Sequence, residues 1–364
     1  MMFSFTENWH YSVNQRSQEF ITMDNFGIYT LANDVVFDQL VALLNSIEVN
    51  VSPDIPICII PYDDRLKRVK QEIRSRPNVT LFDDKSSIKK WEDFAVQVWN
   101  AYPRNSRKNK PSIEWNKKNN LIRKMCAFDG EFERFVFYDA DSLAMNKLDK
   151  VLEKLDQYDF VFDDWEHTKQ TSVAAFDLPK LEQKMSLPES EIRREIHCSS
   201  FFGSKKGILG VEELKILKKR LIEDKEVELI NEIAWWCDAD LFSYMTFRIA
   251  RPLFNFTLSP NGEDRTGNCA NANPFVNIDN VLYNQQGLKP IHRLHYMGYS
   301  AIGFTRLCKG EDVDIRYKNE FLHYRFLKQP EQKPKQLKPP TIAARSNRFI
   351  KKLLNKINQT ISYT

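Results

Sequence analysis

The stretch RFVFYDADSL, residues Arg134–Leu143, decides the fold because an apolar run ends there in two acidic residues. The run Phe135–Tyr138 is typical of a buried β-strand. Asp139 and Asp141 follow at positions i and i+2, which point to the same side of an extended chain. Two carboxylates this close repel each other unless a cation lies between them, and hard divalent cations favour oxygen ligands. The stretch therefore predicts a strand with an Mg²⁺ or Mn²⁺ site at its carboxyl end.

The segments around this stretch alternate between short apolar runs and helical patterns, which indicates an α/β fold with a mostly parallel sheet and crossover helices. We expect strands at residues 26–31, 55–61, 79–82, 134–138, 159–164, 173–176 and 198–203. We expect helices at residues 36–47, 91–99, 116–128, 147–155, 211–222 and 231–248, and irregular chain at 250–324. In open α/β sheets, ligands bind at the carboxyl ends of the strands, where the two aspartates lie.

Composition and charge divide the chain into three parts. With 364 residues, 42% of them hydrophobic, the chain can form one large domain, which we expect at 25–325 after an irregular leader at 1–24. Residues 326–364 read as a basic linker and tail, since ten Lys or Arg and one acidic residue lie between Arg325 and the end. The net charge of the whole chain is +4, so the body is mildly acidic, and we expect no nucleic-acid partner.

Targeting signals and the tail bear on location. The six cysteines form no CxxC pair, and neither a signal peptide nor an apolar run of about 18 residues is present, so we expect a cytoplasmic protein with reduced thiols. In the tail, Phe349, Ile350, Leu353, Leu354 and Ile357 lie at helical spacing beside lysines. A basic amphipathic helix can lie on the inner face of a membrane, dock on its own domain or mediate a dimer, and these alternatives stay open.

Four segments resemble glycosyltransferases of the GT-A fold, and family 8 most closely. They are Tyr29–Leu40, Arg123–Leu143 with its DxD triplet, Asp238–Met245, and the His-x-x-Gly element His295–Gly298. The resemblance implies a GT-A-like fold and metal-dependent transfer of a sugar, of hexosyltransferase type and with retention of configuration. The donor would be a nucleotide-sugar, most often UDP-linked, and the acceptor an unknown glycan, lipid-linked or protein molecule, as in cell-surface glycan synthesis.

The resemblance also implies roles for individual residues. His295 would complete the metal site of Asp139 and Asp141. Contacts to the nucleotide and its diphosphate would come from Tyr29, Ala32, Asn33, Asp63, Arg123, Lys124 and Gly298. For Arg123 and Lys124, a solvated helix face is an equal reading.

Four further carboxylates are candidate catalytic groups: Asp163, Asp164, Asp238 and Asp240. Asp163 and Asp164 end a predicted strand, where they could be turn residues or contact the donor sugar. Asp238 and Asp240 lie on a probable helix at a spacing that lets at most one of them face the site. An inverting enzyme would need one such carboxylate as general base.

The chain departs from the family pattern at three positions. Ala239 replaces a Gln, Ser243 replaces an Asn, and Ala301 stands where a diphosphate-binding Lys is expected. These departures support an alternative, a catalytically altered relative that binds a sugar-nucleotide or a partner without transfer. A nucleotidyltransferase is a further alternative, but the segment YTLANDVVFDQ lacks the Gly and basic residues of a phosphate loop.

Overall fold

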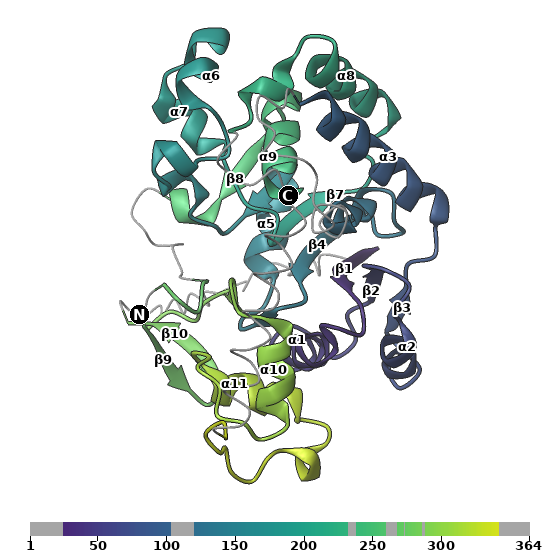
Figure 1. Cartoon of the computed structure of the whole chain (residues 1–364), viewed down its shortest axis with the longest axis vertical. Helices are drawn as coiled ribbons and strands as arrows, with labels where there is room; N and C mark the ends of the chain where they lie inside the picture. Colours follow the sequence, from purple (N-terminus) through teal and green to yellow (C-terminus); the bar gives the residue numbers. More distant parts are fainter. Residues whose placement is uncertain are drawn as a thin grey trace, which may run out of the picture.

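The computed structural model describes residues 25–102, 120–231, 238–259, 268–272, 274–285 and 288–341. At its centre is a seven-stranded sheet (Figure 1) in the order β3-β2-β1-β4-β7-β6-β8. Its strands are β1 (Phe26–Ala32), β2 (Ile57–Pro61), β3 (Val79–Leu81), β4 (Arg134–Asp139), β6 (Phe160–Phe162), β7 (Phe201–Lys205) and β8 (Leu253–Asn255). Only β7 runs antiparallel to its neighbours in this sheet. The predicted α/β fold with a mixed, mostly parallel sheet flanked by helices is confirmed.

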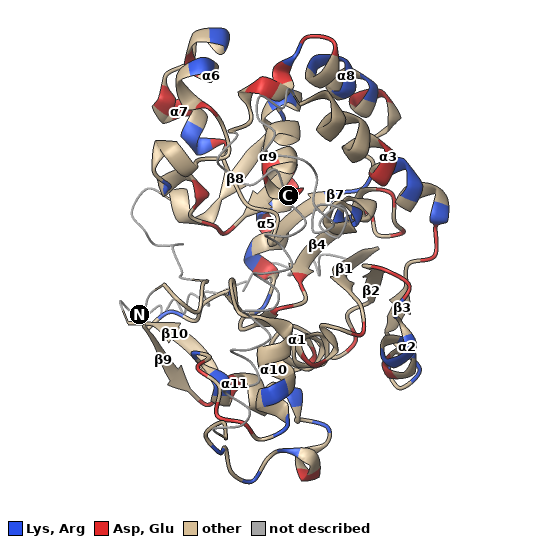
Figure 2. Cartoon of the chain, viewed as in Figure 1, with Lys and Arg blue, Asp and Glu red and all other residues tan. Residues whose placement is uncertain are grey.

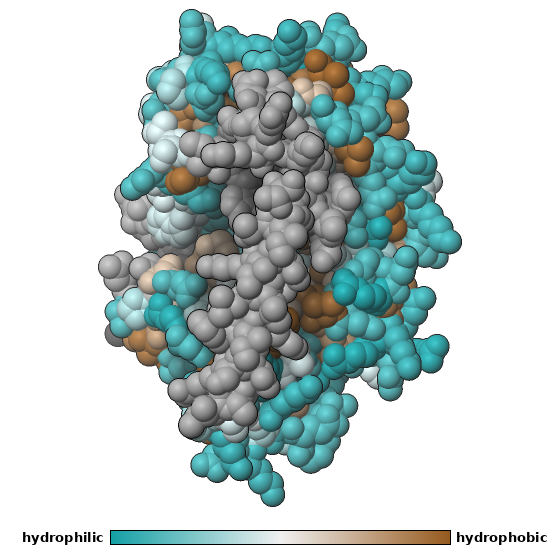
Figure 3. Space-filling view, viewed as in Figure 1, coloured by the Kyte–Doolittle hydropathy of each residue, from teal (hydrophilic) through white to brown (hydrophobic). Residues whose placement is uncertain are grey.

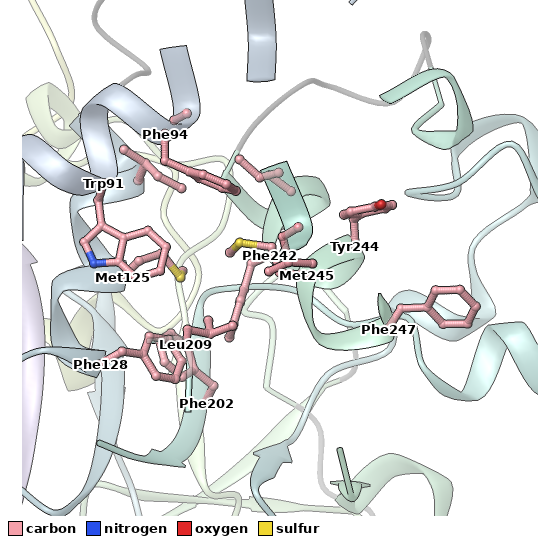
Figure 4. Close-up of a cluster of buried hydrophobic side chains, with 14 of the residues drawn as sticks. Trp91, Phe94, Met125, Phe128, Phe202, Leu209, Phe242, Tyr244, Met245 and Phe247 are labelled. Carbon is pink, nitrogen blue, oxygen red and sulfur yellow. The ribbon is translucent and has the colours of Figure 1, made fainter. Parts of the chain in front are cut away.

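Aromatic side chains fill one face of the sheet. Phe128, Phe202 and Phe242 pack against one another, with ring centroids 4.8 to 5.9 Å apart (Figure 4). Around them, and over this face, lie α3 (Lys85–Ala101), the 3₁₀ helix η2 (Asn120–Phe128), α8 (Val211–Ile222) and α9 (Asp238–Ile249). Shorter elements extend this layer: α6 (Leu178–Met185), α7 (Glu189–Arg194) and the 3₁₀ helices η3 (Glu166–Thr168), η4 (Thr171–Val173) and η5 (Glu226–Leu229).

Mostly aliphatic side chains fill the other face of the sheet. Successive residues of a strand point to opposite faces, so each strand contributes one set of side chains to each face. Ile28, Ile59 and Val136 meet the helices there. These helices are α1 (Phe37–Asn50), α2 (Lys67–Ile73) and α5 (Asp149–Gln157). Burial of the strands on both faces explains why their sequences are continuous apolar runs.

A third group of elements packs on the far side of α1. It contains β5 (Ser142–Ala144), β9 (Phe275–Ile278), β10 (Val281–Asn284), β11 (Arg293–His295), α10 (Ala301–Cys308) and α11 (Lys318–Arg325). The 3₁₀ helix η6 (Phe256–Leu258) follows β8 and packs with the aliphatic face of the large sheet. Two buried contacts fix α11 on α1: Arg325 Nε lies 2.9 Å from Asp38, and Asn45 donates to the Tyr324 carbonyl at 2.7 Å. Figure 1 shows α10 and α11 at the lower side of α1, with the β9–β10 hairpin to their left.

Several element predictions need correction. Residues 173–176 form no strand, because Phe176 makes a single bridge to Ile230 and Thr171–Val173 is a 3₁₀ turn. The helix expected at 116–128 is 3₁₀ over Asn120–Phe128. The stretch 250–324, expected to be irregular, carries β8 to β11, α10 and α11.

The packed body also extends past the boundary expected at 325. Phe326 is buried, η7 (Pro330–Gln332) follows, and Lys338 exchanges backbone hydrogen bonds with Gly310 and Asp312. The predicted leader and amphipathic tail helix lie outside the described residues. Within those residues, no helix is long and apolar enough to cross a membrane.

The coloured part of the surface in Figure 3 is mostly hydrophilic, and the outer helices carry both acidic and basic residues (Figure 2). The cysteines at 58, 126, 198, 269 and 308 are free, as expected for reduced thiols.

Candidate functional site

The short link from β4 to β5 and the pairing of β5 with β11 bring Asp139, Asp141 and His295 together. Asp139 is the last residue of β4, and Asp141 lies directly before β5. Strand β11 pairs antiparallel with β5, with His295 opposite Ser142, and the Tyr296 amide donates to the Asp141 carbonyl at 2.9 Å. One ligand atom from each of the three side chains lies within 4.8 Å of the others.

The charges at this cluster are strongly coupled. Burial by itself would lower the pKa of His295, but the charge of Asp141 and its hydrogen bond raise it to about 9. The imidazole Nε2 lies 3.4 Å from Asp141 Oδ1. Burial favours the protonated form of Asp141, yet His295 outweighs it and lowers the pKa of that carboxyl. The pKa of Asp139 is raised by burial and by the charge of Asp141, against the opposing effect of Lys124.

This donor set fits a divalent cation. Two carboxylate oxygens and one imidazole nitrogen suit Mn²⁺ or Mg²⁺ with open positions for a further ligand. Donors on one such ion lie about 3 to 4 Å apart, so small side-chain rotations close the cluster around it. A cation there would relieve the repulsion that raises the pKa of Asp139.

A cavity of about 870 Å³ opens beside this cluster. It lies at the carboxyl ends of β1, β2 and β4, which are parallel neighbours in the sheet. Its lining includes Leu31, Ala32, Asn33, Val35, Val36, Gln39, Tyr62, Asp63, Asp64, Arg65, Asn120, Leu121, Asp139, Ala140, Asp141, Tyr299 and Ala301. Among these, Gln39, Tyr62, Asp64 and Arg65 were missed by sequence reasoning, although Asp64 follows the end of a predicted strand, where ligands bind.

The predicted nucleoside residues divide into two groups. Ala32, Asn33 and Asp63 line the cavity, and Asn33 Nδ2 donates to Asp63 at 2.9 Å. Asp63 also accepts from Arg65, which lowers the pKa of its carboxyl despite its partial burial. Tyr29 is different: its fully buried ring packs on Phe132, 4.9 Å away, inside the core. Tyr29 lies three residues before the carboxyl end of β1 and is absent from the described cavity lining, so a contact from its side chain to the nucleotide stays a prediction.

The two predicted diphosphate cations have protein partners. Lys124, which is 2% exposed, lies 3.1 Å from Asp139 and 2.8 Å from Asp238, and donates to Ser199 Oγ at 3.0 Å. Burial opposes its charge, but the two aspartates outweigh burial and raise its pKa. Arg123 donates to Glu92 at 2.6 Å and to the Pro61 carbonyl at 2.9 Å. Among the residues found to line the cavity, neither cation appears.

The four candidate catalytic carboxylates lie around the site but are absent from the described cavity lining. Asp163 is 1% exposed and forms an ion pair with Arg293. Asp164 accepts from the amides of Glu166 and Cys198, and burial raises its pKa to about 7. Asp238 is bound to Lys124 and also accepts from Ser199 Oγ, whereas Asp240, two residues further along α9, is half-buried.

Gly298 and Ala301 form the turn that leads from the metal cluster into α10. Gly298 has φ = +85°, a left-handed conformation that favours glycine, and it is exposed. Ser300 caps α10 by accepting from the Gly303 amide, and Ala301 at its first turn lines the cavity. The position expected to carry a Lys thus presents the N-terminus of a helix to the cavity.

Comparisons with known proteins return solved glycosyltransferases. Similar structures include a galactosyltransferase, LgtC, in complex with donor and acceptor sugar analogues, at 11% identity over 82% of this chain and 95% of that chain, with a TM-score of 0.49. The bifunctional glycosyltransferase WbbM matches at 12% identity over 85% of this chain and 51% of that one, also with a TM-score of 0.49. Mouse xyloside xylosyltransferase 1 matches at 8% identity over 63% of this chain and 83% of that one, with a TM-score of 0.45. No protein-family model and no curated protein matches the chain.

Proposed function

We propose that this protein is a metal-dependent glycosyltransferase that transfers a sugar from a nucleotide-sugar to an acceptor. One observation carries the proposal: Asp139, Asp141 and His295 converge at the wall of a cavity of about 870 Å³ at the carboxyl ends of parallel strands. A cavity of this size can hold most of a nucleoside diphosphate. Two carboxylates and an imidazole at its wall suit a cation that binds the diphosphate.

Different residues of the chain would bind the metal ion, the nucleoside and the diphosphate. Asp139, Asp141 and His295 would hold Mn²⁺ or Mg²⁺, which when bound supplies Lewis-acid neutralisation of the leaving diphosphate. Asn33 and Asp63 offer donors and acceptors to the nucleoside across the cavity. Ala301 at the N-terminus of α10 lines the cavity, and a helix N-terminus favours a negative group. Lys124 pairs with both Asp139 and Asp238 and supplies a positive charge between the two carboxylates.

The finer assignment is part of the same proposal. The resemblance to family 8 favours a UDP-linked hexose as donor, Mn²⁺ as metal and retention of configuration. For an inverting reaction, Asp164 and Asp240 would be the remaining candidate bases, because Asp163 and Asp238 are held by buried cations. The basic tail supports a cytoplasmic position against the inner face of a membrane and a lipid-linked or cell-surface acceptor.

Turnover of nucleotide-sugars tests this proposal. The full-length protein is incubated with a panel of nucleotide-sugars and Mn²⁺, and release of free nucleoside diphosphate is measured. We expect metal-dependent release from at least one UDP-sugar, and a loss of at least about 100-fold in the Asp139→Ala variant. The matched control is Asp156→Ala. It removes an exposed aspartate of α5 that pairs with Arg134 on β4. Turnover that is equal in Asp139→Ala and the control contradicts the proposed site.

The second candidate is a protein that binds a nucleotide-sugar without transferring it. Ala301 favours it, because the helix N-terminus at that position carries no side-chain cation. Protection from thermal unfolding by a nucleotide-sugar with Mn²⁺, without any turnover across the panel, would favour this alternative.

A further inference from the structure

A buried ion pair lies beneath the metal cluster. Arg293 Nη2 lies 2.9 Å from Asp163 Oδ1, and Arg293 Nε lies 3.2 Å from both oxygens of the same carboxylate. Both side chains are 1% exposed. A pair this deeply buried adds little stability over apolar residues of the same size, so its geometry is the more informative property.

The pair joins the two sheets that supply the metal ligands. Asp163 directly follows β6 in the large sheet, whereas Arg293 begins β11, two residues before His295. The backbone of β11 pairs with β5 and bridges to Cys269, whereas the Arg293 side chain reaches from β11 to the large sheet.

Two further hydrogen bonds extend the pair to the ligands themselves. Asn268 donates its side-chain amide to the Asp163 carbonyl, and its own carbonyl accepts from the His295 amide. Ser200 Oγ accepts from Arg293 Nη2 at 3.1 Å, and the Ser200 carbonyl accepts from the Asp139 amide at 2.9 Å. The pair is thus one residue removed from the backbone of two of the three candidate ligands.

We propose that Asp163 and Arg293 are positioning residues that hold His295 at the correct distance from Asp139 and Asp141. This inference rests on the metal site of the proposed function. It also gives Asp163 a role other than that of general base, since its carboxylate is fully engaged away from the cavity. A planar guanidinium that binds a carboxylate with two nitrogens defines orientation, which a Lys ammonium does not.

The test compares Arg293→Lys with a matched control. The control is Arg248→Lys, which alters a second buried Arg–carboxylate pair, with Arg248 Nε 2.8 Å from Glu226, at the far end of α9. Both variants keep the positive charge but lose the planar guanidinium that binds the carboxylate with two nitrogens. Asp163→Asn and Ser200→Ala are milder variants, since the first keeps the shape of the side chain and the second removes the hydroxyl that accepts from Arg293.

The readout is binding of Mn²⁺ alone to the full-length protein, at a temperature where circular dichroism shows that every variant is folded. Free Mn²⁺ is titrated by electron paramagnetic resonance, and nitrogen coupling to the bound ion is recorded by pulsed methods. We expect Arg293→Lys to weaken Mn²⁺ binding about 10- to 100-fold and to lose the nitrogen coupling. Arg248→Lys should bind within about twofold of the unmodified protein.

The outcomes separate the two proposals. Mn²⁺ binding and nitrogen coupling in Arg293→Lys that match the Arg248→Lys control would overturn the positioning role while leaving the metal site intact. If the unmodified protein binds no Mn²⁺ at millimolar concentration, the metal site fails and both proposals fail with it. If Arg293→Lys does not fold, Asp163→Asn decides, with weakened binding as the supporting result and unchanged binding as the contrary one.

Discussion

The proton on His295 competes with a metal ion for the same nitrogen. Its pKa of about 9 arises because Asp141 outweighs the effect of burial, so at neutral pH a cation must displace a proton. We expect the dissociation constant for Mn²⁺ to fall about tenfold between pH 7 and pH 8. Calorimetry at the two pH values measures this, with His295→Gln as a control that binds more weakly and with little pH dependence. Equal constants for the unmodified protein would contradict the prediction.

The same proton contributes to the stability of the metal-free protein. Because the pKa of His295 is higher in the folded state than the ordinary 6.5, the stabilisation is fully present below pH 6.5 and is lost as pH rises through about 9. Thermal unfolding without metal should therefore show a midpoint that falls over this range. His295→Gln should remove most of that fall, and a midpoint that falls equally in the variant would contradict the assignment.

Lys124 is the buried cation between two acidic groups. Lys124→Met would leave Asp139 and Asp238 facing each other without a counter-charge, which costs about 3 to 5 kcal/mol in the metal-free protein. Mn²⁺ should restore part of this loss, because it neutralises Asp139. Urea unfolding with and without Mn²⁺ measures both effects. Lys90→Met, which breaks the more exposed pair with Asp129, should cost about 1 kcal/mol or less and show no larger response to Mn²⁺ than the unmodified protein.

For single residues, the sequence is most informative where the residues of a motif lie close together along the chain. Asp139 and Asp141 are two residues apart at the end of an apolar run, and the His-x-x-Gly pattern marks His295. The partners of Lys124 and Asp163 were not predicted, because Asp238 and Arg293 lie 114 and 130 residues away along the chain. No local pattern distinguishes a cation that meets a ligand from one that meets a buried carboxylate.

At the scale of the elements, β1 depends on close contact with the chain before β4. A Cβ on Gly27 would lie 2.4 Å from the ring of Phe132, which is 4% exposed. We expect Gly27→Ala to lower the free energy of unfolding by about 1 to 3 kcal/mol, as overpacking does in other cores. Chemical denaturation measures this loss, and Phe132→Leu in the Gly27→Ala background should recover part of it. A Gly27→Ala variant as stable as the unmodified protein would contradict this packing.

The strands that were predicted are marked by apolar runs, and the helices by apolar residues at helical spacing. The run at 26–31 became β1 and the pattern at 211–222 became α8, with bounds Val211–Ile222. The small strands β5 (SLA) and β11 (RLH) have three residues each and no apolar run, and they pair with each other across the chain. These two strands carry the chain into and out of the metal cluster, so the elements that build the site were the least visible in sequence.

For the whole molecule, strand–helix alternation predicted a mostly parallel sheet but not the order of its strands. The antiparallel β7 lies between β4 and β6, and Ser200 directly before it bonds to Asp139 and Arg293. This order depends on contacts across the full sheet. The domain limit was also invisible, because Pro- and Lys-rich sequence at 329–340 is typical of a linker, whereas Lys338 pairs with Gly310 and Asp312.

The most direct test of the central claim is calorimetric titration of the full-length protein with UDP in the presence of Mn²⁺. The account predicts binding that disappears when EDTA removes the metal and weakens at least about tenfold in Asp139→Ala, while Asp156→Ala binds as the unmodified protein does. No binding of UDP at millimolar concentration with Mn²⁺, or binding of equal strength with and without the metal, would contradict a metal-dependent nucleotide-sugar site at Asp139, Asp141 and His295.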